Sequence, residues 1–207
     1  MTEAELWKAL QEYVHPGNVK VRLMLFWTSN ADSDPSQRLV AAADKLLKEH
    51  GLGLDVRPGV PKQAATTLPY SRVVLTGNDD QVKEVRQLAD TALGGAQSIL
   101  PVIFCPFGEV KGATSWSTNG VTFKDLGSPT FVFINSKVQS ADGLTLLHEI
   151  GHAAGRGHVP MGPTDKIANF MSNESTRTGV LRAQVIDIAN AFFANASAGM
   201  VKSGSKK

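Results

Sequence analysis

Three of the five histidines of this 207-residue chain fall between positions 148 and 158. His148 and His152 are four residues apart, which places both imidazoles on one face of an α-helix, where they can bind one metal ion. Glu149 directly follows the first histidine. On the same helix its carboxylate can reach a water molecule on that ion, where a general base is needed. The segment therefore predicts a helix that carries a metal site.

A straight continuation of this helix cannot make His158 the third ligand. Six residues of helix would carry it about 9 Å along the axis. Gly155 lies between His152 and His158, and glycine tolerates the left-handed conformation that ends many helices. We therefore expect the helix to end at Gly155 and the chain to turn back, so that the three histidines hold one catalytic Zn²⁺ ion.

The spacing of these residues resembles the signature of the metzincin clan of zinc endopeptidases, His-Glu-x-x-His-x-x-Gly-x-x-His followed by a methionine turn. The segment at 168–173, Ala-Asn-Phe-Met-Ser-Asn, is similar to that turn. The resemblance gives Met171 the role of an apolar floor under the histidines, although a methionine taken alone more often serves as core packing. The specific resemblance covers residues 148–173.

The order of expected elements predicts an α/β fold of the α+β zincin type, with a twisted, mostly parallel sheet, helices on its faces and an active-site helix. Apolar runs rich in β-branched and aromatic residues indicate strands, and apolar stripes at helical spacing indicate helices. The expected strands are 19–27, 52–57, 72–76, 99–104 and 130–134, and the expected helices are 2–14, 34–50, 78–93, one from about 140, and 178–193. The unit at 72–93 is an apparent insertion in the minimal metzincin pattern.

Chain length and composition favour a single catalytic domain over residues 1–207. With 42% hydrophobic residues, the chain can bury one sizeable core. The resemblance implies an upper subdomain at 1–157 and a smaller lower subdomain at 158–196 that ends in a helix. We expect residues 197–207, which are rich in Gly, Ser and Lys, to form a disordered tail.

Charge and hydropathy narrow the partners and the compartment. The net charge of +2 is too small and too dispersed for a nucleic-acid binder, and no stretch is long enough to span a membrane. The N-terminus lacks the basic segment and apolar run of a signal peptide. We expect a monomer that is cytoplasmic or is exported without a cleavable signal peptide.

Cys105 is the only cysteine, so an intrachain disulfide is excluded. A cysteine can also hold a zinc enzyme latent by binding its metal. However, Cys105 stands at the end of an apolar strand, which favours a buried and inert thiol.

The resemblance implies a zinc-dependent endopeptidase that acts on a peptide or protein substrate. A water on the zinc ion attacks the peptide carbonyl, and Glu149 accepts its proton as general base and passes it to the departing amine. Two alternatives stay open, namely a catalytically weak zinc-containing module that binds or senses peptides, and a toxin-like effector protease. Glu149 favours an enzyme, because a pure binder needs no carboxylate beside the metal.

The candidate substrate-binding residues lie in two places. An extended peptide can pair with an exposed sheet edge, and the polar segment 112–118 lies between two apolar strands. Ala113, Thr114 and Ser115 are therefore candidates, with a surface loop as an equal alternative. Asn173, two residues after Met171, is a candidate for the substrate pocket. In some metzincins a tyrosine at this position is a further zinc ligand, so the resemblance implies no such ligand where Asn173 stands.

Overall fold

The computed structural model describes the chain over residues 19–27, 34–58, 74–75, 80–95, 98–105, 109–110, 119–123, 130–136, 144–159, 169–172, 179–180 and 182–195. The expected helix at 2–14 and the expected tail at 197–207 lie outside these residues. Within the described ranges, every helix is too short or too polar to cross a lipid bilayer.

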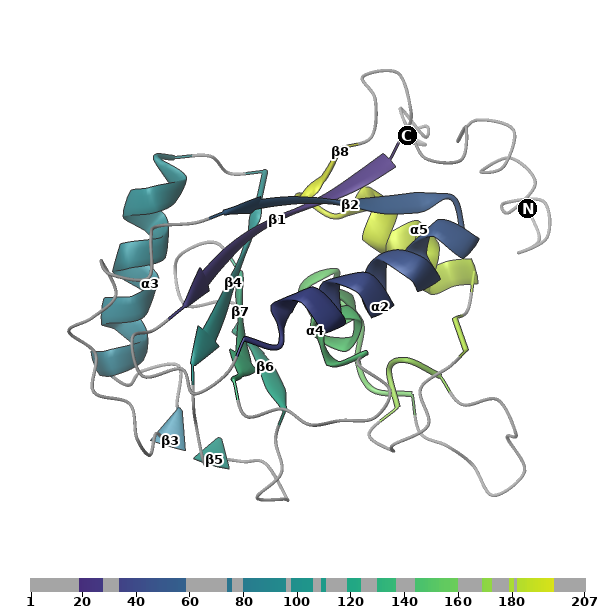
Figure 1. The fold of residues 1–207 in the computed structure, drawn as a ribbon. Helices are drawn as coiled ribbons and strands as arrows, with labels where there is room; N and C mark the ends of the chain where they lie inside the picture. The colour runs from purple at the N-terminus through teal and green to yellow at the C-terminus, as the bar shows by residue number, and fades with distance from the viewer. Residues whose placement is uncertain are drawn as a thin grey trace, which may run out of the picture.

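A twisted, mostly parallel mixed sheet forms the centre of the fold (Figure 1). Along the sheet the strands are β2 (Leu52–Pro58), β1 (Val19–Trp27), β4 (Leu100–Cys105), β7 (Phe131–Asn135) and β6 (Gly120–Phe123). The first four are parallel to one another, and β6 runs antiparallel to β7 at the edge. A short strand, β8 (Ala194–Asn195), pairs antiparallel with the first part of β1. The expected α/β fold is confirmed.

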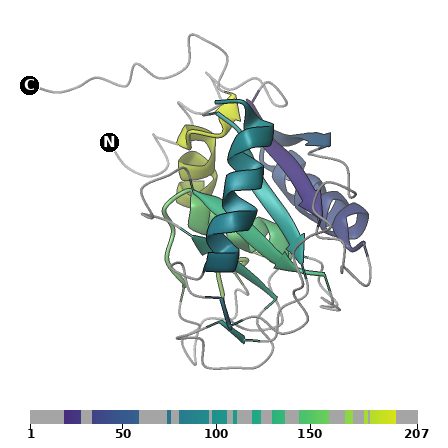
Figure 2. The same ribbon diagram turned by 90° about the vertical axis from the view of Figure 1, so that its left-hand side faces the viewer.

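The two faces of the sheet bury different side chains, because side chains along a strand alternate between faces. One face packs against the helices α2 (Ser36–Glu49), α4 (Thr145–Ala153) and α5 (Arg182–Asn190) and forms the main core with them. The helix α3 (Asp80–Leu93) lies on the other side of the sheet (Figures 1 and 2). There Arg86 stands 5.8 Å from the centre of the Phe131 ring.

The segment at 72–93 does not extend the main sheet. Its strand, β3 (Val74–Leu75), pairs in parallel with β5 (Glu109–Val110) in a separate two-stranded sheet. Within the described residues the expected strand is present at Val74–Leu75, and the expected helix corresponds to α3 (Asp80–Leu93). The sequence reading missed β5, β6 and β8, because strands of two to four residues carry too little periodicity to be seen.

The helices α4 and α5 differ most from their expected bounds. The metal-site helix α4 begins at Thr145 instead of near 140. The last helix, expected at 178–193, is α5 (Arg182–Asn190). It begins later because Gly179 forms a parallel bridge with Asn169, which gives the backbone at 179 an extended partner in place of a helical one.

The helix α4 is held on several sides. All its residues from Thr145 to Gly151 are buried, and it packs against α2, α5, β6 and β7. Leu146, Leu147 and Ile150 belong to the main core. Since such close packing leaves few alternative side-chain arrangements, the neighbouring polar residues of α4 are positioned by the core itself.

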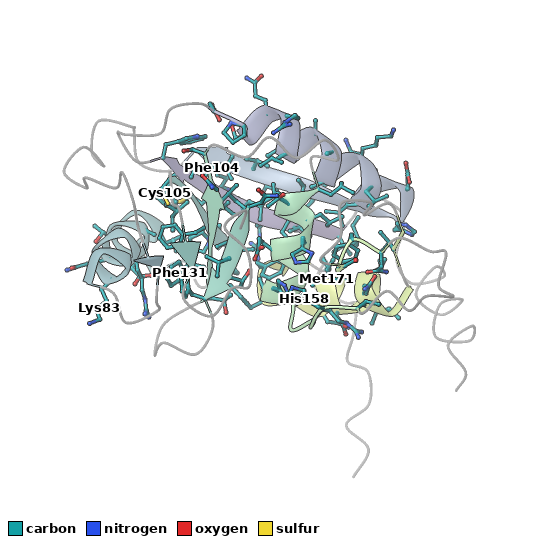
Figure 3. The ribbon with its side chains drawn as sticks, turned by 90° about the horizontal axis from the view of Figure 1, so that it is seen from below. Lys83, Phe104, Cys105, Phe131, His158 and Met171 are labelled. Atoms are coloured by element: carbon teal, nitrogen blue, oxygen red, sulfur yellow. The ribbon has the colours of Figure 1, made fainter. Side chains whose placement is uncertain are left out.

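Cys105 lies on the face of the sheet opposite to α4. Val102 and Phe104 of the same strand belong to the core under α4, so alternation places Cys105 on the other face. The residue is buried, and burial raises the pKa of its thiol. Figure 3 shows Cys105 well separated from His158. The expected buried thiol is confirmed.

We predict that Cys105 is unreactive in the native protein. A thiol reagent such as 5,5′-dithiobis(2-nitrobenzoate) should modify it at least ~10² times more slowly than in the denatured chain. Burial blocks access of the reagent, and the raised pKa of the thiol lowers the amount of reactive thiolate. The measurement compares reaction rates with and without guanidinium chloride. Equal rates would show that this end of β4 opens readily to solvent.

Candidate metal centre

The structure brings the side chains of His148, His152 and His158 together at the end of α4. Nε2 of His152 lies 3.1 Å from Nε2 of His148 and 3.0 Å from Nε2 of His158. The ligand atoms of all three residues lie within 4.8 Å of one another. His148 is buried, His152 is half-buried and His158 is exposed. The cluster is thus reached from solvent on the His158 side.

The turn at Gly155 makes this convergence possible. Gly155 has a φ of +96°, in the left-handed region. The Arg156 N–H donates to the Gly151 carbonyl at 3.0 Å, and the Gly155 N–H donates to the His152 carbonyl at 2.9 Å. These two hydrogen bonds define a Schellman motif, which ends a helix and reverses the chain. The expected helix end is confirmed, and it brings His158 back toward the helix.

Main-chain carbonyls orient two of the imidazoles. Nδ1 of His148 lies 2.7 Å from the Phe170 carbonyl oxygen, and Nδ1 of His152 lies 2.7 Å from the Arg156 carbonyl oxygen. A carbonyl oxygen can only accept a hydrogen bond, so each Nδ1 carries the hydrogen. In neutral rings, Nε2 of both residues then presents a lone pair to the other at 3.1 Å. These lone pairs repel unless a cation lies between them, so the donor set fits a metal ion.

An ion pair joins the segment after α4 to α5. Arg156, whose carbonyl accepts the His152 hydrogen bond, pairs through its side chain with Asp187. The Val159 N–H donates to the Met171 carbonyl at 3.1 Å. The chain on either side of His158 is therefore attached both to α5 and to the segment that contains Met171.

The segment Asn169–Ser172 forms a tight turn. The Ser172 N–H donates to the Asn169 carbonyl at 2.8 Å, and the Met171 N–H donates to Asn169 Oδ1 at 2.9 Å. The buried Asn169 amide also exchanges two hydrogen bonds with the buried Gln184 amide of α5, at 3.1 and 2.8 Å. This pair fastens the turn to α5, and the turn holds the Phe170 carbonyl against His148.

Met171 packs directly beneath α4 at Gly151. A Cβ atom at Gly151 would lie 2.8 Å from Phe170 Cε2 and would overlap Met171 Sδ. Met171 itself is fully buried in the main core. Its backbone neighbours the His158 segment, and both labelled residues occupy the same region of Figure 3. Met171 is therefore packed between α4 and the segment that contains His158.

Glu149 is buried beside the cluster, with 3% of its surface exposed. Its Oε2 accepts a hydrogen bond of 2.7 Å from the Thr122 hydroxyl on β6. Sequence reasoning missed Thr122, since a single threonine in a four-residue strand has no recognisable spacing. It also missed the Phe170 and Arg156 carbonyls, because any residue type can supply a main-chain acceptor.

The candidate substrate-binding residues are not tested by this structure. Ala113, Thr114, Ser115 and Asn173 lie outside the described residues. The polar segment 112–118 as a whole also lies outside them, so the expected edge at 112–118 stays a prediction.

Comparison of the sequence with models of known protein families gave no match, and comparison with curated proteins gave none. The class of protein is therefore described from its fold and its site alone. It is an α/β protein with a mostly parallel mixed sheet, in which two histidines of helix α4 and a third from the turn after it form a cluster that can hold a metal ion.

We predict that the purified chain binds about one zinc ion per molecule and that His158→Ala weakens this binding by at least ~10², because only two ligands remain. Competition titration against a chromophoric chelator measures the affinity. His50→Ala, at the end of α2, is the matched control and should leave the affinity unchanged. Unchanged affinity in His158→Ala, with a loss in Asp165→Ala or Glu174→Ala, would instead assign the third ligand to a carboxylate.

We also predict that Gly151→Ala lowers the free energy of unfolding by about 1–3 kcal/mol, because its Cβ would collide with Phe170 and Met171. Helix propensity alone favours alanine here by up to about 1 kcal/mol, so a lower free energy of unfolding would be due to the collision. Gly157→Ala is the control, since its Cβ would meet nothing within 4 Å. Denaturant unfolding of both variants decides the point, and equal stabilities would refute the close packing at Gly151.

Proposed function

We propose that this protein is a zinc-dependent endopeptidase of the metzincin type, with His148, His152 and His158 as zinc ligands and Glu149 as general base. One observation carries the proposal. Three imidazole Nε2 atoms converge at the end of a helix that Gly155 terminates, with the carboxylate-bearing Glu149 directly after the first ligand.

The donor set favours zinc over other common ions. Neutral imidazoles suit zinc well, and three of them leave a fourth tetrahedral position for water or substrate. Calcium and magnesium prefer oxygen ligands, which the cluster does not contain among the described residues. When bound here, zinc would polarise a peptide carbonyl and lower the pKa of a water molecule toward ~7.

Glu149 would move the proton during peptide hydrolysis. Its carboxylate accepts a proton as water adds to the scissile carbonyl carbon, and then delivers that proton to the peptide nitrogen as the C–N bond breaks. The products are a new carboxylate and a new amine. Because water is the nucleophile, no side chain forms a covalent bond to the substrate.

The substrate would bind as an extended strand along β6. This strand is the last in the sheet order, and its outer edge has no strand partner within the described part of the chain. Main-chain pairing with such an edge holds a peptide with little regard to its side chains. The strand also contacts Glu149 through Thr122, so a peptide on β6 would lie near the general base. Ala113, Thr114, Ser115 and Asn173 remain candidates for further substrate contacts.

The burial of Glu149 supports an enzyme over a zinc-containing binding or sensing module. Placing a carboxylate in a buried position is unfavourable unless hydrogen bonds compensate for lost hydration. Glu149 is 3% exposed and keeps such a hydrogen bond from Thr122. A module that only binds zinc has no use for this arrangement. A toxin-like effector role would use the same chemistry.

We predict that Glu149→Gln keeps the zinc ion and the fold but lowers peptide hydrolysis by at least ~10². Glutamine preserves the shape of the side chain and cannot accept the proton. The measurement is digestion of a peptide library by zinc-loaded protein, with products identified by mass spectrometry and zinc measured in parallel.

Glu49→Gln is the matched control for this experiment, because Glu49 is exposed at the end of α2. It should retain parental activity, and a strong chelator should abolish that activity. A zinc-loaded parent that cleaves no library peptide would overturn the proposed function. A Glu149→Gln variant as active as the parent would overturn the role of Glu149.

A further inference from the structure

We propose that Thr122 is a positioning residue for Glu149, and that Gly120 and Thr122 of β6 together form a cradle for its side chain. The inference rests on the proposed function, because it concerns how the general base is held. It assigns to the edge strand a second task besides pairing with an extended peptide.

The Thr122 hydroxyl lies between two oxygen atoms of Glu149. It is 2.7 Å from Oε2 of the carboxylate and 3.0 Å from the main-chain carbonyl oxygen of the same residue. A hydroxyl has one hydrogen to donate, and the shorter contact to the carboxylate takes it, since charge-assisted hydrogen bonds are the stronger ones. The Thr122 hydroxyl thus contacts both the main chain of Glu149 and the carboxylate at the end of its side chain.

Gly120 leaves the space that the Glu149 side chain occupies. A Cβ atom at Gly120 would lie 2.8 Å from Cγ, 2.9 Å from Oε1 and 3.1 Å from Cδ of Glu149. All three distances are shorter than ordinary van der Waals contact. The side chain therefore lies flat against the backbone of β6, which is possible only because residue 120 carries no side chain.

The register of the sheet places both residues of the cradle on the face toward α4. Gly120 pairs with Ile134 and Thr122 pairs with Val132 on β7. Val132 and Ile134 belong to the core under α4, and directly paired residues share a face. Residues 120 and 122 are two apart, so the alternation of the strand presents both to Glu149.

This cradle has a clear physical use in the proposed reaction. A free glutamate side chain samples many rotamers. It loses conformational entropy when it is restricted to the one rotamer in which the carboxylate can accept the proton. The hydroxyl of Thr122 on one side and the bare backbone at Gly120 on the other restrict that choice before substrate arrives. Such preorganisation raises turnover without changing substrate affinity.

The test compares Thr122→Val, which keeps the branched shape without the hydroxyl, with Thr122→Ser, which keeps the hydroxyl. In the zinc-loaded protein, Thr122→Val should lower kcat ~10-fold or more with KM within about twofold of the parent, while Thr122→Ser should stay within about threefold in kcat. Zinc affinity should be equal in all three. Thr91→Val, on α3 across the sheet, is the control and should match the parent.

A second measurement does not depend on activity. In metal-free protein, Gly120→Ala should lower the denaturation midpoint, and Glu149→Ala should relieve that loss, since the atoms that collide with the new Cβ are then gone. Thr122→Val should likewise lower the midpoint less in the Glu149→Ala background than in the parent, because the hydrogen bond that it removes is already absent there.

The possible outcomes distinguish a failure of the positioning role or of the cradle from a failure of the proposed function. An active parent with Thr122→Val at the same kcat overturns the positioning role and leaves the proposed function standing. A parallel loss in Thr122→Val and Thr122→Ser also overturns it, since the hydroxyl would then not be the cause. Additive midpoints for Gly120 and Glu149 overturn the cradle. An inactive zinc-loaded parent overturns the proposed function, and the positioning role with it.

Discussion

The histidine cluster depends on two hydrogen bonds from imidazole Nδ1 atoms to main-chain carbonyls. His148 is bound to the Phe170 carbonyl and His152 to the Arg156 carbonyl, each at 2.7 Å. Each bond sets the tautomer and the angle of its ring, so that both Nε2 lone pairs face one point. The two acceptors come from different segments, since Arg156 precedes the third histidine and Phe170 follows it in the chain. The geometry of the cluster therefore requires that the turn at Gly155 and the turn at Asn169–Ser172 are both in place.

Those turns are held by the packing of α4, α5 and the sheet. The Asn169 and Gln184 amides bind each other in the interior, which fastens the second turn to α5. Gly151 lets that turn approach α4 more closely than any side chain would allow. The core that stabilises the fold and the contacts that orient the ligands are thus the same contacts.

The edge strand β6 joins the cluster to the place where an extended peptide could pair. Its antiparallel pairing with β7 turns Gly120 and Thr122 toward Glu149 and leaves its other edge unpaired within the described residues. Both properties follow from the position of one short strand at the end of the sheet. A carboxylate buried this deeply must keep a hydrogen-bond donor, and the strand supplies one in Thr122.

The sequence by itself determined the three histidines of the cluster, the helix that carries two of them and the glycine that ends it. These features depend on spacings of three to six residues, and local backbone geometry decides such spacings whatever the rest of the chain does. The longer apolar strands and helices were predictable for the same reason. Thr122, Gly120, the Phe170 carbonyl and the strands β5, β6 and β8 were not. Their roles arise from contacts between distant segments, such as Thr122 with Glu149, 27 residues apart, or β8 with β1 at the opposite end of the described chain. Only the tertiary structure brings those segments together.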